Sequence, residues 1–231
     1  MLIIAHRGAN NLAPENTLSS FNKALQLGAD GIEMDVQLSR DGEPVIIHDE
    51  YLDRTTNGMG AVRDFNHTEL QKLDAGSWFS TSYLNESIPT LKEVFRTFKS
   101  NELIINVELK NDNIQYPGLE EKVISLIDYF NLFERVIVSS FNHNSLFKVS
   151  RLDSRVKLGL LYDQSRPNTN KLENKVDFYT IHPHNSLDYK KPHKKQARVL
   201  PWPVNNREEA IKLAKSHEIF GIITDFPELF C

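Results

Sequence analysis

Two short runs of the sequence, 31–38 and 103–110, place polar residues at every second position between apolar ones. Successive side chains of a strand point to opposite faces, so Glu33 and Asp35 share one face of the first run, and Glu108 belongs to the polar face of the second. Burying three carboxylates costs several kcal/mol each unless a cation or a set of donors compensates. The three side chains offer hard oxygen ligands, which suit Mg²⁺ or Ca²⁺ better than zinc.

A surface sheet is the competing interpretation of this alternation, because an antiparallel sheet can leave its polar face in water. Two such runs that are each followed by a helical pattern instead favour parallel crossovers, which cover both faces of a sheet. We therefore expect both polar faces to point into a barrel, where branched aliphatic side chains normally pack.

Two histidines are expected at the rim where barrel chemistry occurs. His6 ends the first strand-like run, and His48 ends a hairpin that leaves the second. Histidine titrates near neutral pH, so the pair can divide into a general base and a general acid. Either histidine could instead be a structural or surface residue, and a dinuclear metal site that includes histidine is a further alternative.

Two basic residues accompany the carboxylates. Arg7 could hold a phosphate through two hydrogen bonds, and Lys110 shares the face of Glu108 and could supply a point charge. Both could equally serve to balance the carboxylates. A cation, two basic residues and two histidines together are suited to a phosphodiester, because the positive charges neutralise the anion and its transition state while the histidines move protons.

Eight strand-like runs, alternating with helical patterns, would have to position these residues. The predicted strands are 2–6, 31–38, 103–110, 135–140, 156–161, 177–182, 198–204 and 219–225, and the clearest helices are 16–27, 91–98, 119–130, 145–152 and 207–215. Eight βα units in 231 residues predict one TIM (β/α)8 barrel over residues 1–231, in preference to an open doubly wound sheet. The helices after the fifth and sixth strands are poorly marked, and the last helix is expected to be a single turn.

Residues 49–87 interrupt the alternation. The turn Asp41-Gly42-Glu43 predicts a hairpin from the second strand into 44–48, and a short helical pattern follows at 68–73. A long connection after a barrel strand lies over the catalytic face and is usually functional. We expect a small, lid-like insertion at 49–87.

Composition excludes several classes of partner. The formal net charge is −4, and no long basic run supports a nucleic-acid partner. The apolar runs are too short to cross a bilayer, and His6 arrives too early for a cleavable signal, so we expect no stable membrane association. The lone cysteine, Cys231, cannot form an internal disulfide, and a cytoplasmic location is the simplest interpretation. A homodimer is left open.

Nine ordered motifs resemble the glycerophosphodiester phosphodiesterase family, in its short, cytoplasmic, bacterial form. They are His6-Arg7-Gly8, Pro14-Glu15-Asn16-Thr17, Glu33-Met34-Asp35-Val36, His48-Asp49 with Leu52 and Arg54-Thr55-Thr56, Leu73-Asp74-Ala75-Gly76, Ile88-Pro89-Thr90-Leu91, Glu108-Leu109-Lys110, Trp202-Pro203-Val204-Asn205 and Thr224-Asp225-Phe226-Pro227. The match runs from residue 3 to residue 229. The first triplet alone would be a weak signal, whereas nine motifs in order are a strong one.

The resemblance implies a barrel that hydrolyses small glycerophosphodiesters to glycerol 3-phosphate and an alcohol, within lipid and glycerol metabolism. It implies Glu33, Asp35 and Glu108 as ligands of a divalent cation, His6 and His48 as base and acid, Arg7 and Lys110 as phosphate contacts, and Trp202 and Phe141 as residues of the substrate pocket. For both aromatics, packing in the core is an equal alternative. Pro203 departs from the family, which more often has threonine there, and His182 is expected to be structural or to line the pocket.

Two other functions compete with this hydrolase. A phospholipase D-like or cyclising lyase would act on intact lipid and would need an apolar docking loop, for which residues 78–84 supply only a modest cluster. A non-catalytic phosphodiester sensor would lack a metal ligand or a histidine, and none is missing. The order of acid and base, and the choice between water and a glycerol hydroxyl as the attacking group, stay open.

Overall fold

Strands and helices alternate along the computed structural model, which describes residues 1–165, 176–187, 197–216 and 219–231. The strands are β1 (Leu2–Ala5), β2 (Gly31–Leu38), β3 (Pro44–Ile46), β4 (Ile104–Leu109), β5 (Val136–Ser140), β6 (Lys157–Tyr162), β7 (Thr180–Pro183), β8 (Arg198–Val199) and β9 (Gly221–Thr224). The α-helices are α1 (Leu18–Leu27), α2 (His67–Leu70), α3 (Leu91–Phe98), α4 (Leu119–Phe130), α5 (His143–Leu152) and α6 (Arg207–Ser216). The 3-10 turns are η1 (Val62–Asp64), η2 (Thr81–Tyr83) and η3 (Pro227–Leu229).

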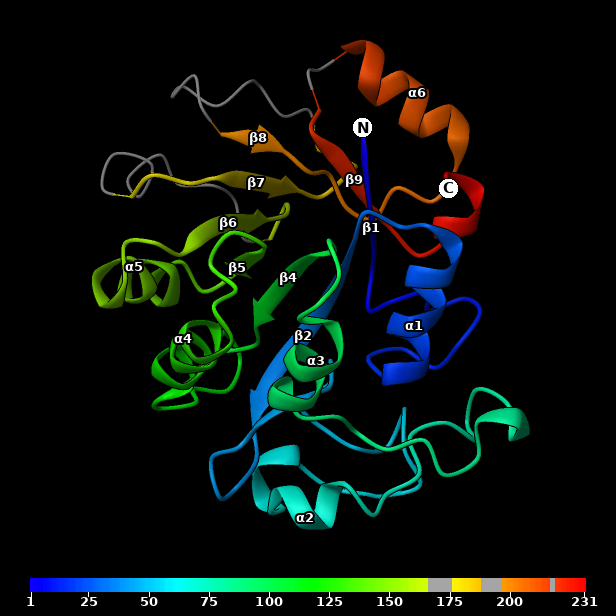
Figure 1. Cartoon of the computed structure of the whole chain (residues 1–231), viewed down its shortest axis with the longest axis vertical. Coiled ribbons are helices and arrows are strands. Elements are labelled where there is room, and N and C mark those ends of the chain that lie inside the picture. Colours follow the sequence, from blue (N-terminus) through cyan, green and yellow to red (C-terminus); the bar gives the residue numbers. More distant parts are fainter. Residues whose placement is uncertain (166–175, 188–196, 217–218) are drawn as a thin grey trace.

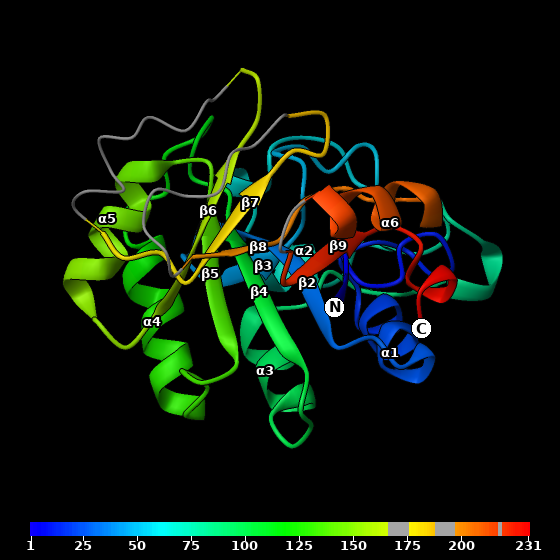
Figure 2. The ribbon, with the colours of Figure 1, turned by 90° about the horizontal axis from the view of Figure 1, so that it is seen from above.

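The parallel strands form a ring in the order β8-β7-β6-β5-β4-β2-β1-β9, and β3 pairs antiparallel with β2. The two ends of this sheet meet, because Phe220 N donates to Val199 O at 2.8 Å and Ile223 N donates to Pro201 O at 3.0 Å. Helices α1, α3, α4 and α5 lie outside the ring (Figures 1 and 2). The predicted barrel is therefore confirmed.

Apolar faces of the strands pack outward against these helices. Ile32 and Met34 of β2 belong to one buried cluster with Phe21 of α1 and Phe95 of α3. Because side chains alternate along a strand, the intervening polar residues of β2 must point into the barrel. Apolar and polar residues thus alternate along β2 because the outer face of the sheet packs against helices, whereas one end of the barrel interior is polar.

The ends of the helices follow their capping residues. Thr17 precedes α1 and its side chain accepts the N–H of Ser20, whereas Gly28 ends the helix in the left-handed region at φ 84°. Before α3, the Thr90 side chain accepts the N–H of Glu93 while the Glu93 carboxylate accepts the N–H of Thr90. Both helices therefore begin at a capping residue, and α1 also ends at one.

Some predicted boundaries differ from the structure. The seventh barrel strand was expected at 198–204, but β8 stops at Val199, because Pro201 and Pro203 have no N–H to donate to a ladder. The strand expected at 177–182 begins only at Thr180. The poorly marked helices after the fifth and sixth strands fall on 166–175 and 188–196, outside the described residues.

Residues 49–87 carry η1, α2 and η2 and pack around a small apolar cluster of their own with the end of the hairpin (Figure 1, around α2). The buried members of this cluster are Val45, Ile47, Leu52, Val62, Leu70, Ala75 and Ile88. In the part of the chain that the structure describes, no helix is both long and apolar enough to cross a membrane.

Candidate active site

The loop after β1 has an unusual backbone that directs the N–H of Arg7 toward a strand carboxylate. Arg7 and Gly8 both adopt left-handed conformations, with φ of 54° and 78°. A Cβ at Gly8 would lie 2.4 Å from Ser20 Oγ, so only glycine fits this turn. In this conformation Arg7 N donates to Glu33 Oε2 at 2.8 Å, and Asn16 N donates to Arg7 O at 3.0 Å.

Three carboxylates converge inside the barrel from neighbouring strands. Asp35 of β2 is paired in register with Glu108 of β4, and Glu33 lies two residues before Asp35 on the same face. All three are buried, and one oxygen of each lies within 4.8 Å of the others. Asp35 also accepts a hydrogen bond from Asn16 Nδ2 at 2.8 Å, whereas Glu33 Oε1 is buried without a hydrogen-bond partner.

The pKa values of the two strand-β2 carboxylates are shifted in opposite directions. Burial and the charges of Asp35 and Glu108 raise the pKa of Glu33, although His6 opposes this. Burial also acts to raise the pKa of Asp35, but the charges of Arg7, His48 and Lys110 outweigh it and lower that pKa. Repulsion among the three buried carboxylates thus opposes the ionisation of Glu33, and a bound divalent cation would relieve that repulsion.

Arg7 and Lys110 bring positive charge to the cluster. Arg7 Nε lies 3.4 Å from Asp35 Oδ2, and Lys110 Nζ lies 3.2 Å from Glu108 Oε1 and 3.8 Å from Asp35 Oδ1. Burial acts to lower the pKa of Lys110, but the adjacent carboxylates, Glu108 first, raise it above its ordinary value. Both side chains therefore stay charged at neutral pH.

His6 is held by the carboxylate of the residue that follows the last barrel strand. Its Nδ1 lies 2.6 Å from Asp225 Oδ1, and Asp225 accepts further bonds from Asn10 Nδ2 and Asn205 Nδ2, each at 2.6 Å. Burial acts to lower the pKa of His6, but the hydrogen bond to Asp225 and the charge of Glu33 raise it overall. The other ring nitrogen, Nε2, faces the carboxylate cluster, 3.9 Å from Glu33 Oε2.

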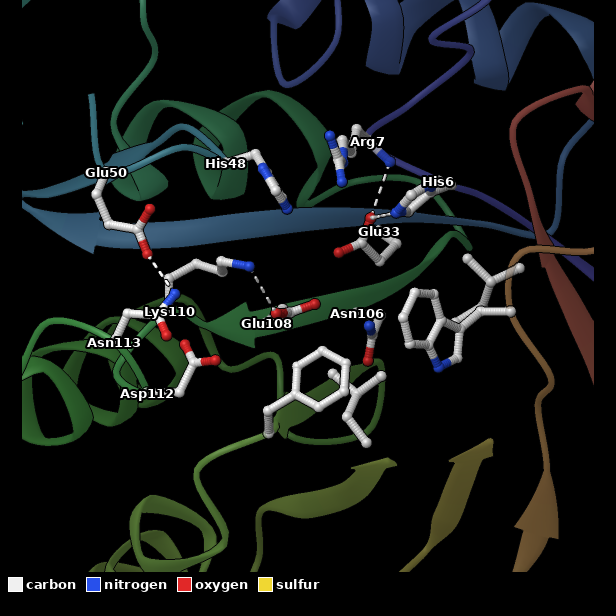
Figure 3. A pocket seen from close by; sticks show the side chains of 14 residues that line it. His6, Arg7, Glu33, His48, Glu50, Asn106, Glu108, Lys110, Asp112 and Asn113 are labelled. Atoms are coloured by element: carbon white, nitrogen blue, oxygen red, sulfur yellow. Dashed lines mark hydrogen bonds and ion pairs between the residues drawn. The ribbon is translucent and has the colours of Figure 1, made fainter. Parts of the chain in front are cut away.

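His48 has a similar arrangement on the opposite side of the cluster. Its Nδ1 lies 2.6 Å from Asp49 Oδ1, which leaves Nε2 as the other ring nitrogen. The backbone behind it is clamped by Gln37, whose Nε2 donates to the carbonyls of Ile47, His48 and Asp49 at 2.8–3.0 Å. Figure 3 shows His6 and His48 on either side of Arg7, both directed toward Glu33 and Glu108.

These side chains line an open cleft that contains about 750 Å³ of space. Of the nine residues predicted for the site, His6, Arg7, Glu33, His48, Glu108, Lys110, Phe141 and Trp202 line this cleft, and Asp35 lies beneath it in the carboxylate cluster.

One wall of the cleft is apolar and aromatic. The rings of Phe141 and Trp202 meet edge to face at 5.5 Å between centroids, and Trp202 Nε1 donates to the carbonyl of His182 at 2.9 Å. On the opposite side, Asn113 donates to Glu50 of the insertion at 2.8 Å (Figure 3). The cleft therefore has an aromatic end and a polar end, with the carboxylate cluster between them.

His182 is fully buried and does not line the cleft. Its Nε2 lies 2.8 Å from Thr180 Oγ1, and its ring packs against Gly159, where a Cβ would come within 2.8 Å of the ring. Burial lowers the pKa of His182 to about 3, so this imidazole is neutral at physiological pH.

The site contains three polar residues to which the sequence motifs assigned no role. Asp225 and Asp49 orient the two histidines, and Asn106 lines the cleft with a buried, unpartnered Oδ1. Asp225 could have been found, because a closed barrel places the end of the last strand beside the end of the first. In the structure, Ala5 is paired with Thr224, and the next residues are His6 and Asp225.

Comparison with known proteins gives consistent likenesses over nearly the whole chain. Residues 6–229 match the model of the glycerophosphoryl diester phosphodiesterase family. A glycerophosphodiester phosphodiesterase of Caldanaerobacter subterraneus is 44% identical over 98% of this chain and 95% of its own. Among solved structures, an Oleispira antarctica phosphodiesterase in complex with the product sn-glycerol-3-phosphate is 33% identical, with a TM-score of 0.85 over 99% of this chain and 94% of that one. A glycerophosphodiester phosphodiesterase from Thermotoga maritima is 30% identical, with a TM-score of 0.79 over 100% and 96%.

Proposed function

This chain belongs to the glycerophosphoryl diester phosphodiesterase family, and we propose that it hydrolyses glycerophosphodiesters to glycerol 3-phosphate and an alcohol by metal-dependent acid–base catalysis. The enzyme class follows from the family and from the 44% identity to the Caldanaerobacter enzyme. The observation that carries the finer proposal is a buried carboxylate cluster that shares one cleft with two carboxylate-bound histidines.

The donor set of the cluster fits a divalent cation. Glu33, Asp35 and Glu108 each offer a carboxylate oxygen, and the buried Glu33 Oε1 has no protein partner. All-oxygen donors of this kind are those that Mg²⁺ and Ca²⁺ prefer, so these three residues would hold the ion. When bound, the cation would neutralise the phosphodiester and the additional negative charge of its transition state.

The two basic side chains are suited to the phosphate. Lys110 is fixed beside Glu108 and presents a permanent point charge to the cleft. Arg7 presents a planar guanidinium, and its backbone N–H is bonded to Glu33. Phe141 and Trp202 offer apolar surface next to this charged region. We assign the phosphate to Arg7 and Lys110, and a neighbouring apolar part of the substrate to the two aromatic rings.

Proton transfer is assigned to the two histidines. With Nδ1 bound to Asp225, His6 has Nε2 free to take a proton from the attacking oxygen. With Nδ1 bound to Asp49, His48 would deliver a proton from Nε2 to the departing alkoxide. A carboxylate at Nδ1 fixes the tautomer of each ring and stabilises its protonated form.

Turnover of glycerophosphocholine in Mg²⁺ or Ca²⁺, measured as release of glycerol 3-phosphate, tests the proposal. Activity should disappear in excess chelator and in Glu33→Gln and Glu108→Gln, with circular dichroism unchanged. In water labelled with oxygen-18, direct attack by water puts the label in the first phosphate product, whereas attack by the glycerol hydroxyl gives a cyclic phosphate. Full activity in chelator would rule out the metal-dependent mechanism.

A further inference from the structure

A continuous chain of ion pairs connects His48 to Arg7 through two residues that the mechanism above does not use. Arg54 binds Asp49, with Nε to Oδ2 at 2.6 Å and Nη2 to Oδ1 at 3.1 Å. The same guanidinium binds Glu15, with Nη1 to Oε2 at 2.7 Å and Nη2 to Oε1 at 2.8 Å. Glu15 Oε1 also accepts a hydrogen bond from Arg7 Nη1 at 2.9 Å. The order of contacts is therefore His48–Asp49–Arg54–Glu15–Arg7.

The two halves of this series of ion pairs come from different parts of the barrel. Asp49 and Arg54 lie at the start of the insertion, whereas Arg7 and Glu15 belong to the loop between β1 and α1. Arg54 bridges them with a two-point contact on each side, a geometry that a planar guanidinium makes and an ammonium does not. A single side chain thus joins the base of the insertion to the loop that carries the phosphate contact.

The ion pairs are well formed even though Arg54 is 44% exposed. The hydrogen bonds that Arg54 donates to Glu15 and Asp49 raise the pKa of Arg54. Burial acts to raise the pKa of both Glu15 and Asp49, but the bonds to Arg54 lower each overall, that of Asp49 to about 2. Arg54, Glu15 and Asp49 are therefore all charged in the folded enzyme at neutral pH.

Packing does not enclose the imidazole of His48. Its side chain is 30% exposed, and one side of it lines the cleft. The orientation of the ring therefore depends on the bond from Nδ1 to Asp49. The orientation of Asp49 in turn depends on Arg54, which occupies both of its oxygens.

We propose that Arg54 and Glu15 are positioning residues that hold the proton-donating histidine and the phosphate-binding arginine in one fixed frame. This inference rests on the proposed function, because it assigns His48 to the leaving group and Arg7 to the phosphate. Arg54 acts on His48 through Asp49, and Glu15 acts on Arg7 directly and on His48 through Arg54. Neither side chain lines the cleft.

The inference is tested by comparing two substrates that share the glycerophosphate half. Glycerophosphocholine has a poor alcohol leaving group, whereas a glycerophosphoaryl ester releases a phenolate that needs no proton. Arg54→Ala should lose about 10²-fold in kcat on glycerophosphocholine, as expected for a misplaced catalytic group, and recover most of this loss on the aryl ester. Arg54→Lys should behave like Arg54→Ala, because it keeps the charge but loses the two-point contacts. Glu15→Gln should lose activity on both substrates, because it also releases Arg7.

A double-mutant cycle and a matched control complete the experiment. If Arg54 acts through His48, Arg54→Ala should have almost no effect on glycerophosphocholine in a His48→Ala background. Arg40→Ala removes another arginine that is ion-paired to the insertion, through Glu69 at 3.1 Å, and should leave both activities unchanged. Equal losses on the two substrates in Arg54→Ala, or additive effects in the cycle, would overturn the inference. Failure of the proposed function would instead appear in the wild type, or as an equal loss on both substrates in His48→Ala.

Discussion

At the level of single residues, His6 and His48 have similar surroundings, each with Nδ1 2.6 Å from a carboxylate oxygen. Their roles must therefore be separated by chemistry. On glycerophosphocholine, alanine at either position should cost roughly 10²- to 10⁴-fold in kcat, since each group moves one proton. On an aryl phosphodiester, His48→Ala should recover most of its lost kcat, whereas His6→Ala should not. Steady-state rates on both substrates make the comparison, and an equal defect of His48→Ala on both would contradict its assignment as the acid.

The buried His182 predicts a specific loss of stability in acid. Its pKa is lowered to about 3 in the folded protein, whereas an unfolded histidine titrates near 6.5. Between these values the unfolded chain binds the extra proton, so stability falls as the pH falls. The free energy of unfolding should decrease by roughly 3 kcal/mol between pH 6.5 and pH 4 from this group alone. Urea unfolding at several pH values measures this dependence.

Two variants isolate the contribution of His182. His182→Gln removes the titrating ring and should flatten the pH dependence between 4 and 6.5, whatever its effect on overall stability. Thr180→Val removes the 2.8 Å partner of the ring but keeps the imidazole, and should retain the steep dependence. If the free energy of unfolding of His182→Gln fell with pH as steeply as that of the wild type, other groups would cause the acid sensitivity.

Residue types and alternation were enough to place the carboxylates but not their partners. The period of two in 31–38 put Glu33 and Asp35 on the inner face, and the structure has both buried there. The contact from Asn16 to Asp35 depends on a left-handed backbone at Asn16, with φ 57°, which no local periodicity encodes. The pairing of Arg54 with Glu15 likewise depends on how the insertion folds against the first loop.

At the level of the elements, amphipathic periodicity predicted α3 and α4 at 91–98 and 119–130, where the structure has them. Short strands that end in proline-containing segments were less predictable. β8 keeps only two residues, because Pro201 and Pro203 in the following segment lack the backbone N–H that a continued strand would donate. Strand length thus depended on backbone donors that hydrophobic patterning does not reveal.

Two glycines, one in the turn after β1 and one at the C-terminal end of α1, should respond very differently to substitution by alanine. Gly8 and Gly28 both have positive φ, at 78° and 84°. A Cβ at Gly8 would come within 2.4–2.7 Å of Ser20 atoms, whereas a Cβ at Gly28 would meet nothing within 4 Å. Gly28→Ala should therefore cost only the left-handed strain, about 1–2 kcal/mol, and Gly8→Ala should cost about 3 kcal/mol or more.

Urea unfolding in the presence of chelator compares these two variants without any contribution from cation binding. Gly8→Ala should also lose activity, because the same turn sets the Arg7 N–H on Glu33. Gly28→Ala should keep it. Equal destabilisation by the two substitutions would show that the close approach of Gly8 to Ser20 does not constrain the turn.

At the level of the whole molecule, closure of the barrel assembles the site from the two ends of the chain. His6 and Asp225 are 219 positions apart in sequence, and they meet because β1 pairs with β9. Eight βα units predicted that closure, but which polar groups would meet across it depends on register. Ile4 pairs with Ile223 and Ala5 with Thr224, and a shift of one residue would turn Asp225 away from His6.

The same assembly predicts that a divalent cation stabilises the entire fold. Glu33, Asp35 and Glu108 come together only in the native barrel, so an ion that binds all three favours the folded state over the unfolded chain. At a hundred times its dissociation constant, the ion should add about 2.7 kcal/mol, which raises the melting temperature of a chain of this size by roughly 5–10 °C. Differential scanning calorimetry with and without Mg²⁺ or Ca²⁺ measures the shift. Glu33→Gln and Glu108→Gln should lose most of it, while Glu134→Gln, at a carboxylate whose side chain is 94% exposed, should keep it. An undiminished shift in Glu33→Gln would place the stabilising ion somewhere other than the cleft.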